Sequence, residues 1–179
     1  DKVGEPFRSF PLEMMRYGAG GIGHWGSVCG IVNGGCAMLG LFQSEKEKKK
    51  REQLITEFCT WYETTSLPMY QPAEPEWADE AASCVPGSIL CHVAISNWCE
   101  ATGRHAYCME KKERCRRTTA DGAVKVVEIL NRNLAGNFEK PELTSEVQAC
   151  VTCHGKEGKG DPVVKMNCAS CHQFEEKHP

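Results

Sequence analysis

Two short motifs near the end of the chain combine residue types that could carry chemistry. In each, two cysteines separated by two residues are followed directly by a histidine: Cys150-Val151-Thr152-Cys153-His154 and Cys168-Ala169-Ser170-Cys171-His172. Two thiols at this spacing can add to the two vinyl groups of one haem, and the adjacent histidine can then bind the iron from one side. The pattern is therefore typical of c-type haem attachment.

A zinc ribbon is the alternative interpretation of the same four cysteines. The 14 residues between Cys153 and Cys168 fall just short of the spacing of about 15 to 20 residues that is usual between the two halves of such a site. The histidines favour haem. With 6 histidines in 179 residues, chance places one after a given cysteine pair in about 1 case in 30, and after both pairs in about 1 in 900.

The residue that binds the second face of each iron decides what the haems can do. His154 and His172 are the expected proximal ligands, which leaves six methionines and four histidines for the opposite face: His24, His92, His105 and His178. His24 is favoured because nearby glycines let a haem approach the backbone. His178 is close to the chain end and either serves the neighbouring haem or remains unbound. An iron whose second face is occupied by a protein ligand suits electron transfer, whereas an iron with an open second face permits catalysis.

Eight further cysteines lie outside the two motifs. Cys91, Cys99, Cys108 and Cys115 follow one another at intervals of 8, 9 and 7 residues, too wide for the compact runs of ferredoxins or zinc sites. Thiolates from a helix, the next loop and the next helix can still converge on an iron-sulfur cluster. Disulfides and inert buried thiols are the alternatives. Cys29 and Cys36, seven residues apart on one helix face, are expected to pack in the core more than to bind metal.

Helices are expected to position these side chains. The small apolar stretch 28–42 predicts one helix, and the Ser44/Glu47 capping box predicts a second that carries Leu54, Phe58 and Tyr62. Three prolines between residues 66 and 76 predict a loop.

Two further helices are expected after this loop. One starts at Pro86 or Ser88 and ends at Gly103, and residues 108–117 then form a charged connection. The last is capped by Thr119 or Asp121 and ends at Gly136. Its predicted inward face is Val124, Val127, Leu130 and Leu134.

Composition divides the chain into two expected domains, a cysteine-rich helical domain over 1–140 and a tail over 141–179. Hydrophobic residues make up 41%, but the 12 cysteines supply 12 of 179, so other apolar residues account for only about 34%. The polar, glycine-punctuated tail lacks the apolar surface to fold alone. We therefore expect an all-α fold whose irregular tail is organised by two c-type haems.

Charge and hydropathy exclude several functions. The net charge is −3 and no arginine-rich block is present, which argues against a nucleic-acid partner. No apolar run approaches the roughly 20 residues that a membrane span requires. Covalent haem attachment indicates a periplasmic protein whose export signal has been removed or was not included.

The motifs together resemble a known family. Cys29, the run Gly35-Cys36-Ala37-Met38-Leu39-Gly40 and later cysteines including Cys115 match the C_GCAxxG_C_C pattern, and Gly20 to Gly23 fit its glycine-rich lead-in. Joined to a tail with two CxxCH motifs, the chain resembles the split-Soret cytochromes c. The resemblance implies a homodimer, two adjacent haems per subunit with bis-histidine ligation partly supplied across the dimer, and an iron-sulfur centre in the helical domain.

These observations predict an electron-transfer protein more than a catalyst. The expected function is the carriage of single electrons through two bis-histidine haems, and an iron-sulfur centre, to redox partner proteins. The alternative is a haem oxidoreductase that reduces a small oxyanion or peroxide at an open distal site.

Overall fold

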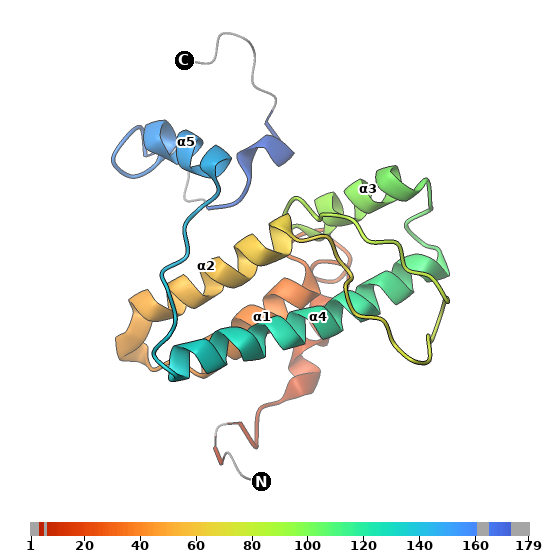
Figure 1. Cartoon of the computed structure of the whole chain (residues 1–179), viewed down its shortest axis with the longest axis horizontal. Coiled ribbons are helices and arrows are strands. Elements are labelled where there is room, and N and C mark those ends of the chain that lie inside the picture. The colour runs from red at the N-terminus through yellow and green to blue at the C-terminus, as the bar shows by residue number, and fades with distance from the viewer. Residues whose placement is uncertain (1–3, 6, 161–164, 173–179) are drawn as a thin grey trace.

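The computed structural model describes residues 4–5, 7–160 and 165–172, and this part of the chain contains helices and turns with no strand beyond two isolated bridges (Figure 1). The α-helices are α1 (Gly30–Leu41), α2 (Lys48–Thr64), α3 (Cys91–Thr102), α4 (Met109–Leu134) and α5 (Ser145–His154). Three 3-10 helices are also present: η1 (Leu12–Gly18), η2 (Glu45–Glu47) and η3 (Cys168–Ser170). The expected all-α class is confirmed for the described residues.

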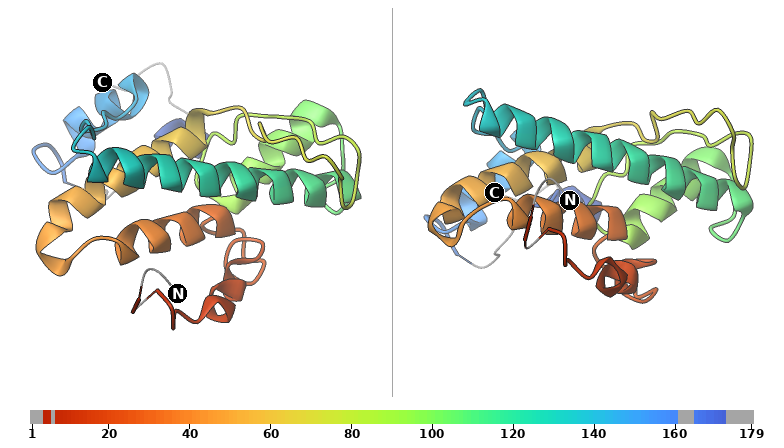
Figure 2. Two further views of the ribbon diagram at one scale, coloured as in Figure 1. Left: turned by 60° about the horizontal axis from the view of Figure 1, so that its bottom comes forward. Right: turned by 90° about the horizontal axis from the view of Figure 1, so that it is seen from below.

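The core lies where α1 packs against α2 and α4 (Figures 1 and 2). Two glycines permit the close approach: a Cβ on Gly35 would lie 2.2 Å from the ring of Phe58, and one on Gly122 would lie 2.8 Å from Ile31. The fully buried apolar side chains in the two clusters around these contacts include Val32, Leu39, Leu54, Phe58, Tyr62 and Ile129. Packing at this density needs the glycines, because larger residues would force the helices apart.

The first two expected helices are present. Helix α1 lies within the predicted stretch, with Cys29 as its N-cap residue. The Ser44/Glu47 capping box forms at η2, directly before α2. Leu54, Phe58 and Tyr62 are fully buried along α2, as their helical spacing predicted.

The third helix begins later than expected, at Cys91 instead of Pro86 or Ser88. Gly87 has a φ of 73°, and Leu90 forms an antiparallel bridge with Val28, so residues 87–90 follow a turn and an extended path. The helix ends as predicted, with Gly103 in the left-handed conformation.

The expected charged connection over 108–117 and the caps at Thr119 or Asp121 are wrong, because α4 already begins at Met109. Cys108 is the N-cap residue, and its sulfur accepts a hydrogen bond from the Lys111 amide at 3.4 Å. Asp121 instead accepts hydrogen bonds from the Met69 and Tyr70 amides, at 2.8 and 2.9 Å. Charged side chains of α4 thus hold the loop that links α2 to α3.

The predicted inward face of α4 is wrong at three of its four positions, and only Leu130 packs against the core. Val124, Val127 and Leu134 are 59%, 55% and 80% exposed, while Val126 and Ile129 are buried. The loop over residues 66–90 covers the polar face of α4, where Glu113 and Asp121 bind its backbone amides. The polar face of α4 is therefore buried, and Val124 and Val127 are exposed.

Helices α5 and η3 of the tail lie beside α2, on the side away from α1 (Figure 1). Lys165 Nζ donates to Thr56 Oγ1 at 3.2 Å, and Ser170 Oγ donates to the Gly87 carbonyl at 2.8 Å. Val147 of α5 is 2% exposed. No helix in the described part of the chain is both long and apolar enough to cross a membrane.

The α1/α2 contact predicts opposite effects for two adjacent glycines. Gly35→Ala should reduce the free energy of unfolding by about 1–3 kcal/mol, because its methyl group meets the buried Phe58 ring. Gly34→Ala is the matched control: a Cβ there meets nothing within 4 Å, and alanine favours a helix over glycine by roughly 0.5–1 kcal/mol. Urea unfolding of both variants measures the difference, and equal effects would contradict this packing.

Candidate redox sites

A short antiparallel pairing brings two cysteines together at the start of α1 and α3. The Cys29 amide donates to the Ile89 carbonyl at 2.8 Å, and the Cys91 amide donates to the Ser27 carbonyl at 2.7 Å. The thiols of Cys29 and Cys91 are hydrogen-bonded across this pairing. Cys29 is buried in the core, as predicted, but its contact with Cys91 is the first feature that sequence reasoning missed.

The environment of this pair favours one thiolate. The hydrogen bond from Cys91 lowers the pKa of Cys29 to about 6, against the opposing effect of burial. Tyr62, which packs beside Cys29, also lowers the pKa of that thiol, while burial raises the pKa of the tyrosine. The lowered pKa favours the thiolate form of Cys29, which is the form that acts as a metal ligand or nucleophile.

A buried arginine completes this cluster. Arg114 is 1% exposed, and its Nε and Nη2 atoms have no hydrogen-bond partner; the buried Tyr62 hydroxyl has none either. Burial acts to lower the pKa of Arg114, but Tyr62 and Cys115 raise it, and Cys115 shares a hydrogen bond with the guanidinium. A buried cation with unsatisfied donors is costly unless an anion accompanies it.

Two of the four cysteines predicted to bind an iron-sulfur centre, Cys91 and Cys115, interact with this cluster. Cys91 and Cys115 act on each other electrostatically, and a cluster bound by thiolates is an anion that would satisfy Arg114. Cys99 and Cys108 lie about 12 and 10 Å along their helices from Cys91 and Cys115. In the described part of the chain, no three histidine, cysteine or acidic side chains are spaced as a metal site.

The glycine-rich lead-in packs against the start of α3. A Cβ on Gly21 would lie 2.8 Å from Cys91 Cβ, and one on Gly26 would lie 3.0 Å from His92 Cβ. His24 has a φ of 70°, and its ring lies over Gly20. Its side chain is exposed, so the lead-in presents His24 on the surface beside the cysteine cluster.

The first CxxCH motif forms the last turn and a half of α5. Cys150, Cys153 and His154 are spaced by three and four residues, which places them on one face of the helix. Cys153 is exposed and the other two are half-buried. Thiols and imidazole on one surface-facing side fit the requirements of a haem bound by two thioethers and a histidine.

The second motif forms a similar turn through η3. The amides of Cys171 and His172 both donate to the Cys168 carbonyl, at 3.1 and 3.0 Å. The pKa of Cys168 is raised by burial and by the neighbouring Cys150, whose thiol is hydrogen-bonded to it. The fold therefore brings the first cysteine of one motif against the first cysteine of the other.

The remaining predicted histidines are not gathered at these motifs. His92 and His105 are exposed on α3 and on the turn after it, and His105 Nδ1 accepts a hydrogen bond from the Tyr107 amide at 3.2 Å. His178 lies outside the described residues.

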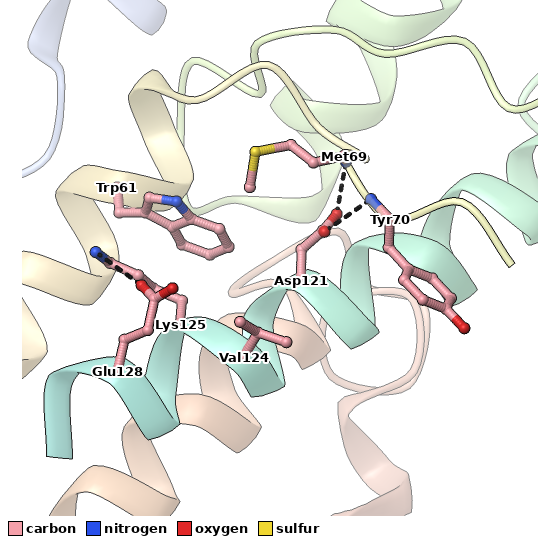
Figure 3. A pocket seen from close by; sticks show the side chains of 7 residues that line it. All are labelled: Trp61, Met69, Tyr70, Asp121, Val124, Lys125 and Glu128. Carbon is pink, nitrogen blue, oxygen red and sulfur yellow. Dashed lines mark hydrogen bonds and ion pairs between the residues drawn. The ribbon is translucent and has the colours of Figure 1, made fainter. Parts of the chain in front are cut away.

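A surface hollow of about 230 Å³ lies between α2, α4 and the loop that joins α2 to α3 (Figure 3). It is lined by Trp61, Met69, Tyr70, Asp121, Val124, Lys125 and Glu128. Asp121 is committed to the Met69 and Tyr70 amides, and Lys125 to Glu57 and Glu128. Asp121 and Lys125 of the hollow are therefore already paired with other groups of the protein, and its exposed surface is the apolar one of Met69 and Val124.

The helical body that gathers thiols, joined to a tail with two CxxCH motifs, defines a thiol-rich redox protein. The family model described as "Putative redox-active protein (C_GCAxxG_C_C)" matches residues 6–129. The chain belongs to this C_GCAxxG_C_C family.

Two relatives extend the similarity into the tail. The split-Soret cytochrome c of Desulfovibrio desulfuricans is 34% identical over 185 residues, which cover 96% of this chain and 63% of that protein. A solved structure, described as a novel iron centre in the split-Soret cytochrome c of the same organism, has a TM-score of 0.88 and 31% identity, and covers 98% of this chain and 75% of that one. The predicted resemblance to the split-Soret cytochromes c is confirmed.

A buried carboxylate holds α4 and the loop over residues 66–90 in the arrangement that places Arg114. Glu113 accepts hydrogen bonds from Arg116 and Arg117, and from the amides of Glu76 and Trp77. Arg116 first, and then Arg117 and the amides, lower the pKa of Glu113 from 4.5 to about 2 against the effect of burial.

The lowered pKa of Glu113 predicts a loss of stability in acid. A carboxylate whose folded-state pKa is depressed stabilises the fold above about pH 4.5, and this contribution disappears as the pH falls towards 2. Glu113→Gln should therefore lower the urea midpoint at pH 7 and flatten the decrease between pH 4.5 and 2. Glu128→Gln, on the exposed side of the same helix, is the control and should retain the wild-type pH profile.

Proposed function

We propose that this protein carries single electrons through two c-type haems and an iron-sulfur centre. The haems are attached at Cys150 and Cys153, and at Cys168 and Cys171, with His154 and His172 as proximal ligands. Each haem iron, when bound, accepts and releases one electron. The observation that supports this most directly is the contact between Cys150 and Cys168, which brings the two attachment motifs together.

The chain supplies position and environment for these groups. The motifs lie on a polar tail whose Lys165 and Ser170 bond to the helical body, and covalent macrocycles would add the apolar surface that this tail lacks. Similarity to a cytochrome c supports haem, and the novel iron centre described for the solved split-Soret structure supports an additional iron centre. Because the chain spans 63% of the length of its curated relative, the redox partner proteins that would donate and accept electrons are part of this proposal.

The proposed iron-sulfur centre lies at the cysteine cluster beside Arg114. Cys29, Cys91 and Cys115 are the strongest ligand candidates, since the first two are in contact and the third bonds to the guanidinium. Cys99 and Cys108 complete the set of candidates. Arg114 would donate to an anionic cluster and favour its more negative, reduced state.

A homodimer in the periplasm is part of the proposal. His24 is exposed on the glycine-rich lead-in, where it would bind a haem of the other subunit, and His178 is a further ligand candidate. Exposed Val124 and Val127 of α4 and Met69 next to them would give a second copy an apolar surface to cover.

Cofactor content tests the central claim. Denatured, acid-extracted protein should exceed the mass of the bare chain by two haems, and Cys153→Ala should leave a chain with reduced haem retention at one motif. Iron should exceed two atoms per chain and be accompanied by acid-labile sulfide. That excess should be absent from Cys115→Ala and retained in Cys84→Ala, the matched control. A bare-chain mass would refute the proposal.

Replacement of His24 tests the distal ligand. His24→Ala should leave one haem high-spin in the visible spectrum and weaken subunit association in sedimentation, because the iron loses a strong-field ligand. His105→Ala, which also removes an exposed histidine, should leave both haems low-spin. An unchanged spectrum in the His24 variant would remove this residue from the ligand set.

A further inference from the structure

A second pair of thiols lies between α1 and α2, apart from the proposed cofactor ligands. Cys36 and Cys59 are half-buried, their thiols are hydrogen-bonded, and both side chains pack against the core cluster that includes Val32 and Tyr62. Neither cysteine belongs to a CxxCH motif, and Cys36 lies two helical turns along α1 from Cys29.

The packing of the two helices holds these sulfur atoms together. Gly35 and Phe58 immediately precede Cys36 and Cys59, and a Cβ at Gly35 would come within 2.2 Å of the Phe58 ring. The tight helix approach is therefore centred on the residues next to the thiols. Cysteines brought into contact by rigid elements can form a disulfide with little backbone movement.

A buried carboxylate lies one helical turn beyond Cys59. Glu63 is 7% exposed, and its Oε1 atom has no hydrogen-bond partner. Burial raises the pKa of Glu63, and its charge acts on Cys59. The unsatisfied oxygen next to a thiol is suited to accept a proton, the role of a general base.

The two thiols differ in their ease of ionisation. The hydrogen bond from Cys59 lowers the pKa of Cys36 against the effect of burial. The same hydrogen bond, together with burial, raises the pKa of Cys59, while Lys165 opposes that increase. Because Glu63 lies one turn from Cys59 on the same helix, we assign Cys59 as the thiol that loses its proton to this carboxylate, and Cys36, whose pKa is lowered, as the first nucleophile.

We propose that Cys36 and Cys59 form a redox-active dithiol that exchanges with disulfides of small thiols or proteins, with Glu63 as the proton acceptor for Cys59. This activity transfers two electrons and is separate from the single-electron function of the haems.

The exchange occurs in two balanced steps. The Cys36 thiolate attacks one sulfur of the disulfide RS–SR, so that a Cys36–SR bond forms and RS⁻ leaves. Glu63 then takes the proton of Cys59, whose sulfur attacks Cys36 and releases the second RS⁻. The chain loses two electrons and forms the Cys36–Cys59 disulfide, and RS–SR is reduced to two thiolates. Excess thiol reverses both steps.

Equilibration of the holoprotein with oxidised and reduced glutathione tests the pair. After the remaining thiols are alkylated, peptide mapping of the oxidised sample should give one linked peptide containing Cys36 and Cys59, which reduced glutathione removes. Absence of this peptide under fully oxidising conditions, or scrambled pairing with other cysteines, would overturn the proposal.

Single variants separate the roles of the residues. Cys59→Ser should stop at a glutathione adduct on Cys36, and Cys36→Ser should form neither adduct nor linked peptide. Cys84→Ser replaces a half-buried thiol that donates to the Val85 carbonyl at 3.3 Å, and it should match the wild type. Glutathione bound at Cys59 in the Cys36 variant would reverse the assigned order of attack.

The role of Glu63 has its own test. Glu63→Gln should keep the final disulfide but slow ring closure at least about tenfold, so that the Cys36 adduct accumulates in a time course. A purely structural role would change the urea midpoint and leave this rate unchanged. Visible spectra recorded in parallel report the haems independently, because the dithiol is expected to react whether or not the tail carries them.

Discussion

The close approach of α1 to its neighbours is the constraint on which the remaining structure depends. Gly35 leaves room for the ring of Phe58, and Gly122 of α4 leaves room for Ile31, so three helices share a core with no space for another methyl group at either point. Packing of this kind fixes the rotation of α1 as well as its distance from α2 and α4. The positions of Cys29 and Cys36 follow directly from that rotation.

Helix α1 consequently connects two different thiol environments. At its start, Cys29 meets Cys91 near a buried cation and a tyrosine. Two turns later, Cys36 meets Cys59 near a buried carboxylate. Positive charge stabilises bound anions such as thiolate-ligated iron, whereas a buried carboxylate with one unpartnered oxygen favours removal of a proton. The two proposals thus assign metal binding to cysteine at one end of α1 and thiol exchange to cysteine at the other.

Periodicity and motifs predicted the parts of this fold that local sequence controls. The Ser44/Glu47 cap and the buried stripe of α2 needed only neighbouring residues, and the CxxCH spacing specified its own chemistry. The start and rotation of α4 could not be predicted, because Glu113 and Asp121 are buried by a distant loop. Contacts such as Cys29 with Cys91 join residues 62 positions apart, and no local pattern contains that information. Gly34, Gly35 and Gly40 within one predicted helix indicate that another helix packs closely there, but they do not identify that helix.

The connection between α4 and α5 determines where the tail can operate. Residues 135–144 leave α4 at one end of the molecule and pass alongside α2 before α5 begins (Figure 1). Ten residues reach at most roughly 33–36 Å when fully extended. The segment therefore acts as a tether of limited length, and deletions within it would restrict the docking position of both CxxCH motifs, whereas insertions would leave that position to the weaker hydrogen bonds at Thr56 and Gly87.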